Sequence, residues 1–580
     1  MLNRTFDRSD QPIPRHTSEP IAALPRGAAI TQSVILRSAW PLVLLLALGL
    51  SSLAFFSAPN IIGLFHDDGI YTVVAKALSE GDGYRIISLP GEPYQTKYPF
   101  LYSYLLSWAW SLNPQFPENI PLLNFVTVFS YFASLLLAYV FYVQNTEGGK
   151  ADALLYVFLV GANAFVFSWT SYPLSDIPFM AVALFCLTLS NPANSFSTRT
   201  KSIVLLAAGC GSAFLLRSAG AALILAGLIY LLLARQRKQF YLYIAVVGSL
   251  ILPWVLWQAM HGSAAVENPL LAYYHSYESP AFFLAGSDPA IAVQIIGANL
   301  LYSARTVDSL MFLHILPELR VVIYPLMIWG LWSIMRRQNV FCNGFILFYT
   351  VLILSWPWHP ARYLMPLFPV LLLSLFQGVQ AATAIIRPHA TKAWSAAIVP
   401  FAIRVPIGIV VGLIAVSLWS YTQLNRTNHL ALWAGFRASY GWSGFGETFS
   451  WIKQNTRSDD VLATPYDPMY YLYTGRKAVR PWIHRPETYF YPYGNAKPDL
   501  GSIEDIRESL NQLGVRFLVV NPLEGYSERI AAADLFANLL QSYKVQPELV
   551  FESSDGLHRI YALPPPQAKS RTAPSTTTVS

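Results

Sequence analysis

The chain has 580 residues, of which 54% are hydrophobic and only 12% are charged. This charged share is about half of that in an average soluble domain, so the composition excludes an ordinary water-soluble protein and a disordered chain. The net charge of +7 does not indicate a nucleic-acid surface, because Lys and Arg gather in short loops between apolar runs. The composition therefore predicts a polytopic membrane protein.

Residues 1–34 are largely polar, and we expect them to form a cytoplasmic N-terminal tail. Residues 35–422 contain apolar stretches that are long enough to cross a bilayer, which takes roughly 17–25 helical residues. Eleven such stretches occur near residues 36–57, 120–143, 152–170, 176–192, 201–216, 218–234, 240–259, 321–335, 340–356, 363–380 and 404–422. The sequence thus predicts an α-helical transmembrane domain of about eleven spans.

Basic residues indicate which ends of the spans face the cytoplasm. They are Arg4, Arg8, Arg15, Arg26 and Arg37, then Arg199 and Lys201, Arg235, Arg237 and Lys238, Arg336 and Arg337, and Arg387 and Lys392. If the short apolar stretch 99–112 also crossed, the later basic loops would lie outside. We therefore interpret it as a juxtamembrane or re-entrant helix. With eleven spans, the loop 58–119, the turn 171–175, the loop 260–320 and the region after residue 422 face the outer compartment.

The first outer loop, residues 58–119, opens with three ionisable residues, His66, Asp67 and Asp68. The apolar residues that follow have helical spacing, and Gly81 can end that helix. Asp67 stands at the expected N-cap, so helix capping is one interpretation of this residue. Capping needs a single acceptor, however, and three ionisable groups beside the membrane also indicate a site of chemistry.

Two further charged residues lie on the outer side. Lys97 precedes Pro99 and the short helix, and its compact charge suits a bound phosphate, although it could equally anchor the loop to lipid headgroups. Asp176 begins a span directly after the turn 171–175, where it could also be a simple helix cap. The first outer loop and this turn thus place three carboxylates in one compartment.

Other candidates lie at outer span ends and in the loop 260–320. Arg217 and Arg362 are cations that could face a phosphate, and a role as topological anchor is an equally simple interpretation of Arg217. Tyr273 and Tyr274 belong to an aromatic cluster that is typical of an interfacial belt, or alternatively could stack on a sugar ring.

Residues 423–563 have the composition of a soluble domain that follows the last span. Helices are predicted at 446–455, 503–513 and 531–543, and strands at 461–464, 517–520, 549–551 and 559–563. This alternation predicts a small extracytoplasmic α/β domain. The Pro-, Ser- and Thr-rich residues 564–580 are expected to form a disordered tail.

A metal cofactor is not required by any spacing of ligand-type residues. A divalent ion stays possible, with His66 and Asp67 as candidate ligands, and the ligand set is unknown.

The order of these motifs along the chain and their predicted side of the membrane resemble the GT-C superfamily of membrane glycosyltransferases. The resemblance is greatest to the RgtA-like, protein O-mannosyltransferase and lipid A aminoarabinose transferase branches. The matching features are Asp67-Asp68 with Tyr71, Lys97-Tyr98-Pro99, Asp176, and Arg362-Tyr363 with Pro366. The family often has Lys-Pro-Pro where this chain has Lys97-Tyr98-Pro99, which indicates a different local backbone. The resemblance covers most of the chain and includes its spans and its outer C-terminal domain.

This resemblance implies an enzyme that moves a sugar from a polyprenyl-phosphate donor to an acceptor hydroxyl by an inverting displacement. Asp67 would be the general base, with Asp68 and Asp176 positioning it or the acceptor, or holding a metal. Lys97, Arg217 and Arg362 would stabilise the leaving phosphate. Tyr71, Tyr273 and Tyr274 would bind the substrate. The acceptor could be a glycan, a lipid or a protein.

A bacterial inner membrane with chemistry on its periplasmic face would suit the outer domain. A transporter or lipid flippase is the chief alternative, but the sequence has no internal repeat and no charge deep within a span. A scaffold or receptor would leave the cluster of Asp67, Asp68 and Lys97 unexplained.

Overall fold

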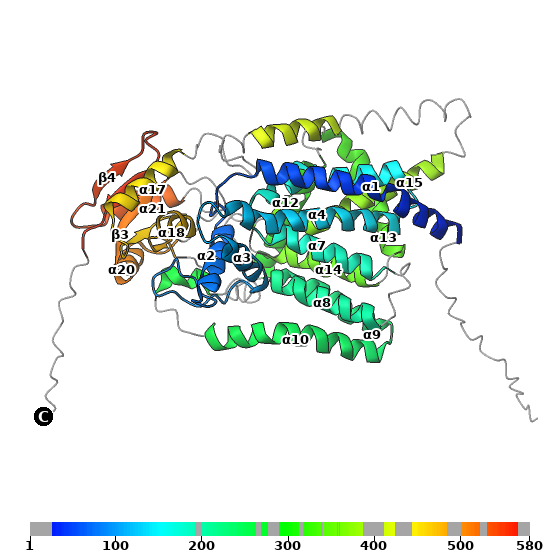
Figure 1. Cartoon of the computed structure of the whole chain (residues 1–580), viewed down its shortest axis with the longest axis horizontal. Helices are drawn as coiled ribbons and strands as arrows, with labels where there is room; N and C mark the ends of the chain where they lie inside the picture. Colours follow the sequence, from blue (N-terminus) through cyan, green and yellow to red (C-terminus); the bar gives the residue numbers. More distant parts are fainter. Residues whose placement is uncertain are drawn as a thin grey trace, which may run out of the picture.

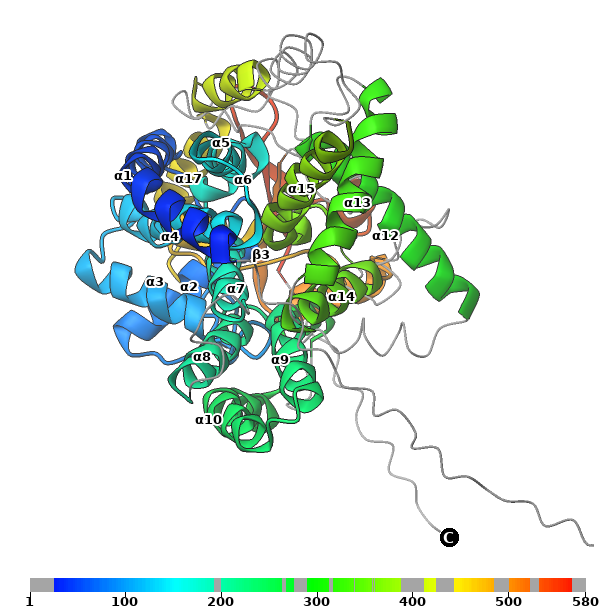
Figure 2. The same cartoon turned by 90° about the vertical axis from the view of Figure 1, so that its right-hand side faces the viewer.

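The computed structural model describes residues 26–191, 200–262, 268–275, 289–311, 317–337, 340–356, 358, 360–386, 411–423, 443–483, 500–521 and 531–565. Figure 1 shows long helices that lie side by side, with a sheet and shorter helices stacked at one end of the bundle. Viewed along the helices, the sheet lies behind the bundle (Figure 2). The molecule therefore has a helical layer and, at one end of it, a second layer, which we name the outer layer after its predicted side of the membrane.

The helical layer contains most of the described residues. Its helices are α1 (Arg26–Ser57), α4 (Ile120–Asn145), α5 (Lys150–Gly161), α6 (Ala164–Ser168), α7 (Asp176–Leu189), α8 (Thr200–Leu216), α9 (Ala221–Leu233), α10 (Arg237–His261), α12 (Pro289–Leu310), α13 (Arg320–Arg337), α14 (Val340–Ser355) and α15 (Phe368–Ile386). Residues 411–423, which overlap the last predicted span, are helical as well. Short 3₁₀ helices join several of them: η1 (Trp169–Ser171), η2 (Ser218–Gly220), η3 (Pro269–Tyr274), η4 (Pro317–Leu319) and η5 (Arg362–Leu367). Helix α1 begins inside the segment expected to be a polar tail, whose first 25 residues lie outside the described part.

Five helices in the described residues are long and apolar enough to cross a membrane, or six if one bent pair is counted as a span. The five are Ser38–Ser57, Ile120–Asn145, Arg237–His261, Pro317–Arg336 and Arg362–Ile385. Four shorter apolar helices lie among them, at Asp176–Leu189, Thr200–Leu216, Ser218–Leu233 and Val340–Ser355. The chain is thus an integral membrane protein, whereas the number of eleven spans stays a prediction.

The span expected at residues 152–170 is not one straight helix. It divides into α5 and a second segment, Ala164–Ser171, with a bend of 50° between them. The Asn163 side chain stabilises the break, because its Oδ1 accepts a hydrogen bond from the Phe165 N–H and its Nδ2 donates to the Leu310 carbonyl. The Tyr131 hydroxyl donates to the Gly161 carbonyl at the end of α5. Side chains thus satisfy backbone groups that an unbroken helix would pair internally.

The outer layer begins with two helices of the first outer loop, α2 (Asp67–Glu80) and α3 (Leu101–Leu112). The predicted end of α2 is confirmed, because Gly81 adopts φ 90° there. The predicted short helix is α3, whose 12 residues span about 18 Å at 1.5 Å per residue, well below the thickness of a bilayer core. In Figure 1 both helices lie at the end of the bundle that carries the sheet.

The C-terminal part of the outer layer, which we call the outer domain, is a five-stranded sheet with flanking helices within residues 443–565. Its elements are α17 (Ser443–Asn455), β1 (Val461–Ala463), α18 (Asp467–Thr474), β2 (Ala478–Val479), α20 (Ile503–Gln512), β3 (Val515–Val520), α21 (Ala531–Gln541), β4 (Glu548–Glu552) and β5 (Arg559–Ala562). The strand order is β2-β1-β3-β5-β4, in which β1 pairs in parallel with β2 and β3, and β5 pairs antiparallel with β3 and β4. Every helix and strand predicted here occurs, whereas α18 and β2 were not predicted. Residues 566–580 of the expected tail lie outside the described residues.

The outer sheet packs closely on the first outer loop. The Ala478 N–H of β2 donates a hydrogen bond to the Ser88 carbonyl at 2.9 Å. A Cβ at Gly63 would lie 2.6 Å from the Met469 Cβ, and a Cβ at Gly69 would lie 2.8 Å from the Pro468 Cβ. Glycine is therefore needed at both positions for α18 to approach the loop this closely.

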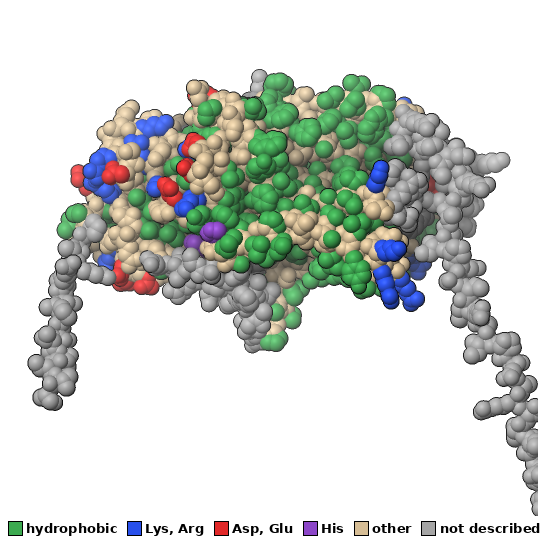
Figure 3. Space-filling view, turned by 60° about the horizontal axis from the view of Figure 1, so that its bottom comes forward, with side chains coloured by type: hydrophobic (Ala, Val, Ile, Leu, Met, Phe, Trp, Pro, Cys, Tyr) green, Lys and Arg blue, Asp and Glu red, His purple; other side chains and the backbone are tan. Residues whose placement is uncertain are grey.

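Side-chain type changes along the molecule. In Figure 3 hydrophobic side chains dominate the middle of the surface, acidic and basic side chains mix at the sheet end, and Lys and Arg gather at the opposite end. A broad apolar surface is expected where helices face lipid, because the backbone polar groups are satisfied inside each helix.

Candidate active site

The start of α2 differs from the sequence prediction. Asp67 is not the N-cap, because the helix begins at Asp67 itself and His66 stands at the cap position without a side-chain cap bond. Asp68 instead organises the turn, since its carboxylate accepts hydrogen bonds from the Gly63 N–H at 2.7 Å and the Phe65 N–H at 3.0 Å. Burial raises the pKa of Asp68 to about 6, although these N–H groups oppose the rise. Asp68 therefore stabilises the backbone of residues 63–65, whereas the Asp67 side chain contacts other elements.

Asp67 is paired with a cation from a distant part of the chain. The Arg362 Nη2 lies 2.5 Å from Asp67 Oδ2, and the Tyr98 hydroxyl donates a hydrogen bond to Oδ1 at 2.7 Å. Burial alone would raise the pKa of Asp67, but the Arg362 guanidinium and the Tyr98 hydroxyl hold it well below its ordinary value. Asp67 is therefore ionised in this structure and bound to two donors.

Arg362 joins Asp67 to the third predicted carboxylate. Its Nε lies 3.4 Å from Asp176 Oδ1, and the same oxygen lies 2.5 Å from Arg217 Nη1. Asp176 begins α7, Arg217 follows α8, and Arg362 opens η5. Four separate elements thus contribute one alternating chain of charges, formed by Asp67, Arg362, Asp176 and Arg217.

The predicted aromatic residues surround these charges in two groups. The Tyr71 hydroxyl hydrogen-bonds with Ser175 Oγ at 3.1 Å, and its ring centroid lies 5.1 Å from that of Tyr98. The Lys97 ammonium donates to the Tyr273 carbonyl at 2.9 Å and lies 3.2 Å from the centroid of the Tyr273 ring. Lys97 is buried beneath this ring, so a cation–π contact adds to its hydrogen bond.

A second polar cluster borders the site from the outer domain. His66 Nε2 lies 3.3 Å from Asp467 Oδ1, and Arg480 Nε lies 3.4 Å from the same oxygen. The rings of Tyr273 and Tyr274 lie 5.5 and 5.6 Å from the His66 ring. Burial raises the pKa of Asp467 to about 7 against the opposing charge of Arg480, and burial lowers the pKa of His66. This cluster is therefore more weakly charged than the chain of ion pairs beside it.

Sequence reasoning missed Tyr98, Asp467 and Arg480. Tyr98 stands inside the Lys97-Tyr98-Pro99 segment, where its departure from the family pattern could have drawn attention to it. Asp467 precedes Pro468, and this pair at the start of a helix was the available signal for α18. Nothing in the local sequence marks Arg480, because its role depends on the outer domain packing against the first loop.

No family model and no curated protein matches the sequence. A search of solved structures finds ArnT from Cupriavidus metallidurans bound to undecaprenyl phosphate, with a TM-score of 0.53 and 14% identity over 90% of this chain and 98% of that one. The chain has the GT-C fold. The same GT-C protein without ligand matches with a TM-score of 0.52, 14% identity and the same coverage. The archaeal oligosaccharyltransferase AglB from Archaeoglobus fulgidus, in complex with an inhibitory peptide and a dolichol-phosphate, gives a TM-score of 0.46 and 12% identity over 84% of this chain and 70% of that one.

The GT-C resemblance drawn from short motifs is thus confirmed at the level of the fold. Within this fold, the structure gathers the predicted residues at the junction of bundle and outer layer. Asp67, Asp176, Arg217 and Arg362 share ion pairs, while Lys97 and His66 both contact Tyr273.

The possible metal site at His66 and Asp67 does not fit this arrangement. Among the described residues there is no group of three or more His, Cys, Asp or Glu side chains placed to hold a metal ion. His66 faces Asp467, and both oxygens of Asp67 are occupied by Arg362 and Tyr98. We therefore derive no catalytic step through a metal.

Proposed function

We propose that the protein is an integral-membrane glycosyltransferase that moves a sugar from a polyprenyl-phosphate donor to an acceptor hydroxyl. The observation that carries this proposal is the ionic chain of Asp67, Arg362, Asp176 and Arg217, joined from four elements at one end of the bundle. Carboxylates and guanidinium groups side by side can serve both halves of such a transfer, namely deprotonation of the acceptor and stabilisation of the departing phosphate. The GT-C fold supports the same reaction class.

In the proposed mechanism Asp67 is the general base of a single inverting displacement. Arg362 holds the Asp67 pKa low in the free protein, which keeps the carboxylate ionised but makes it a weak base. A donor phosphate is a strong competing partner for a guanidinium. When Arg362 turns to this phosphate, the Asp67 pKa rises and the carboxylate becomes able to accept the hydroxyl proton. Donor binding would thereby activate the base.

The remaining predicted residues take positioning and binding roles in this proposal. Lys97 and Arg217 add positive charge around the phosphate, and Asp176 holds the two arginines in place. Asp68 fixes the turn that carries Asp67. Tyr71, Tyr273 and Tyr274 line the surroundings and offer hydroxyl groups and ring faces to the sugar.

In the proposed orientation the protein lies in a bacterial inner membrane, with the sheet on the periplasmic side and the N-terminus on the cytoplasmic side. The gathering of Lys and Arg at the end of the bundle away from the sheet supports it (Figure 3). The transmembrane domain would then extend over residues 35–422 and the extracytoplasmic domain over residues 423–563, with the catalytic loop at 58–119. The acceptor class, whether glycan, lipid or protein, is set by this outer face.

Undecaprenyl phosphate is the natural first probe, because ArnT, which shares the fold, was solved with this lipid bound. The test is thermal stabilisation of the purified full-length chain in detergent by undecaprenyl phosphate, with undecaprenol as the phosphate-free control. At about 100 times the Kd, a ligand that binds only the folded state adds about 2.7 kcal/mol and raises Tm by several degrees.

We expect a shift with undecaprenyl phosphate that is absent with undecaprenol. Lys97→Ala should reduce the shift, whereas Lys453→Ala, which removes an exposed lysine from α17, should leave it unchanged. Equal shifts with both lipids, or none with either, would contradict a phosphate site in this protein.

A further inference from the structure

The residue before Asp67 has an unusual backbone conformation. His66 adopts φ 62° and ψ −55°, and the Asp67 N–H donates a 2.6 Å hydrogen bond to the Phe65 carbonyl. This geometry closes a γ-turn with positive φ, which is the rarer and more strained of the two γ-turn forms. A β-carbon-bearing residue keeps such a conformation only when its surroundings fix it. The position of Asp67 therefore depends on what holds the turn.

One side of this turn is held from within the first outer loop. The Asp68 carboxylate accepts two backbone hydrogen bonds, from Gly63 and Phe65, and so fixes the chain that enters the turn. These bonds do not involve the His66 side chain. They stabilise the backbone that precedes the turn, whereas the imidazole contacts other groups.

On the other side, the outer domain contacts the turn at the His66 imidazole. Asp467 and Arg480 lie beside it, with Asp467 Oδ1 3.3 Å from His66 Nε2 and 3.4 Å from Arg480 Nε. Residues His66, Asp467 and Arg480 are 7%, 0% and 8% exposed, so water does not compete for these contacts. The Tyr273 and Tyr274 rings cover the imidazole.

The close packing of α18 explains how a carboxylate from the outer domain reaches this position. Asp467 is the first residue of α18, and the next two residues, Pro468 and Met469, pack directly on Gly69 and Gly63. These glycines lie on either side of the strained turn. The start of α18 therefore packs on the two glycines that flank the turn and also contacts the His66 imidazole within the turn.

We propose that Asp467 and Arg480 are positioning residues through which the outer domain holds the His66 γ-turn and thereby sets the place of the Asp67 carboxylate. This inference rests on the proposed function only for the step in which Asp67 acts on a substrate. The outer domain then serves transfer without touching the sugar: Asp467 restrains His66, the turn places Asp67, and Asp67 keeps its geometry toward Arg362 and Tyr98.

The test is a cycle of four full-length proteins: wild type, Asp467→Asn, His66→Gly and the double variant. Glycine adopts positive φ freely, so His66→Gly removes the strain together with the imidazole that Asp467 holds. If Asp467 acts by restraining His66, its substitution has nothing left to disturb in the glycine background. Two readouts are used: sugar transfer from the undecaprenyl-phosphate donor, and amide hydrogen exchange in a peptide covering residues 63–70.

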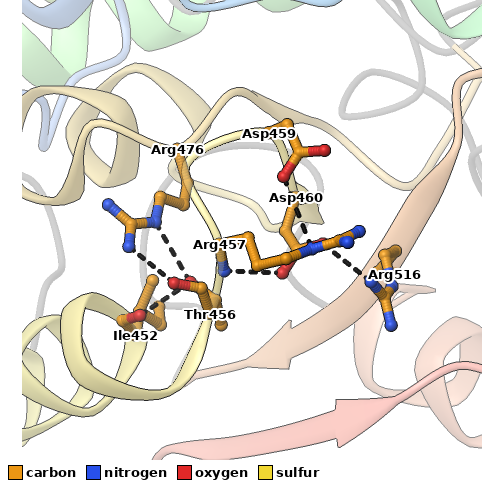
Figure 4. Close-up of polar contacts among 7 residues, drawn as sticks. All are labelled: Ile452, Thr456, Arg457, Asp459, Asp460, Arg476 and Arg516. Atoms are coloured by element: carbon orange, nitrogen blue, oxygen red, sulfur yellow. Dashed lines mark hydrogen bonds and ion pairs between the residues drawn. The ribbon is translucent and has the colours of Figure 1, made fainter.

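Asp460→Asn is the matched control. Asp460 is another buried carboxylate of the outer domain and has arginine partners of its own within that domain, with Arg516 Nη1 at 3.0 Å and Arg457 Nη2 at 3.5 Å (Figure 4). The substitution makes the same chemical change in the same domain. It reports how much a lost buried carboxylate disturbs the outer domain in general.

We expect Asp467→Asn to lower kcat roughly tenfold while changing KM for the donor less than about twofold, because it displaces the base and leaves the phosphate site in place. In the His66→Gly background the same substitution should change kcat less than about twofold. Exchange in residues 63–70 should speed up about tenfold in Asp467→Asn but stay unchanged in Asp460→Asn.

Three results would overturn the inference. An equal loss of kcat in both backgrounds would mean that Asp467 acts on substrate directly. Unchanged exchange in residues 63–70 would mean that Asp467 does not hold the turn, and faster exchange throughout α17 and β3 would indicate general loosening of the domain. If the wild type transfers no sugar but exchange responds as expected, the proposed function fails and the positioning role stands.

Discussion

The two halves of the candidate site are stabilised by opposite means. On the bundle side, Asp67, Arg362, Asp176 and Arg217 form close ion pairs, and the Asp67 pKa is held low by its cation. On the outer-domain side, burial outweighs the charge of Arg480, so the Asp467 pKa rises to about 7. The same residue type is thus kept ionised in one half, whereas in the other half it is partly protonated near neutral pH. Proximity to arginine alone does not set the charge of an aspartate; the balance with burial does.

Removing an ion pair from the bundle side of the site should have the largest effect on stability. Arg217→Met leaves the buried Asp176 without its nearest cation, and losing one partner of a buried ion pair typically costs about 3–5 kcal/mol. Thermal unfolding in detergent should show the corresponding drop in Tm. The double variant Arg217→Met, Asp176→Asn should recover much of it, because it removes the stranded charge. Equal Tm values for the single variant and the wild type would show that the pair contributes little.

The contact between the two halves can be broken next, at Gly63. Its φ is 100°, and a Cβ there would lie 2.6 Å from the Met469 Cβ, so Gly63→Ala combines backbone strain with overpacking and should cost about 2–4 kcal/mol. Gly81→Ala is the matched control, because Gly81 has φ 90° but no atom within 4 Å of the added Cβ. Its loss should be limited to the backbone strain. A Gly81 variant as unstable as the Gly63 variant would indicate that packing of α18 on the loop is unimportant.

The pH dependence of stability should sharpen the comparison. A carboxyl group whose pKa is raised on folding binds more protons in the folded state, so its contribution to stability falls as pH rises between its unfolded and folded values. For Asp467, which faces His66, Arg480 and Tyr274, this window extends from about 4 to about 7. The Tm difference, wild type minus Asp467→Asn, should therefore decrease from pH 5 to pH 8.

Asp67 should behave in the opposite way. Its lowered pKa contributes stability above the unfolded value of about 4, and this contribution is lost only as pH falls further. Asp67→Asn should thus leave the slope of Tm between pH 5 and pH 8 unchanged. A slope that changes in Asp67→Asn but not in Asp467→Asn would reverse the assignment of charge to the two halves.

A surface ion pair provides the baseline for these effects. Arg559 Nε lies 2.7 Å from Glu552 Oε1 across β4 and β5, and both side chains are more than 40% exposed. Exposed pairs contribute about 0–1 kcal/mol, so Arg559→Ala should change Tm by no more than a degree or so. A larger drop in Tm would mean that the outer sheet itself is marginally stable. The effects of the other outer-domain variants would then have to be compared with the effect of Arg559→Ala.

The sequence predicted the general architecture because apolar length and basic loops are local signals. It also predicted that Asp67, Asp176, Lys97, Arg217 and Arg362 share one compartment, since sidedness follows from the order of the spans. It did not predict which carboxylate pairs with which cation. Residues 67 and 362 are 295 positions apart, and only the tertiary fold brings their side chains together.

The errors in the sequence analysis have physical causes as well. Asp67 looks like an N-cap because it precedes an apolar helical pattern, but the helix already begins at Asp67 itself, and the neighbouring Asp68 binds the N–H groups of Gly63 and Phe65, which precede the helix. The span at 152–170 is apolar throughout, and its bend at Asn163 arises from a side-chain hydrogen bond that hydropathy does not report. Asp467 and Arg480 were missed because their contacts cross from one layer to the other.

The central claim is that Asp67 accepts a proton during sugar transfer, and the most direct measurement is turnover of Asp67→Asn. Wild type, Asp67→Asn and Glu80→Gln, which changes a carboxylate on the same helix outside the site, are compared with undecaprenyl-phosphate-linked sugars and a membrane glycolipid extract. General base catalysis contributes about 10²–10⁴-fold, so Asp67→Asn should lose at least about 100-fold in kcat while still binding undecaprenyl phosphate. Glu80→Gln should retain wild-type turnover. Near-normal turnover of a folded Asp67→Asn protein would contradict the account.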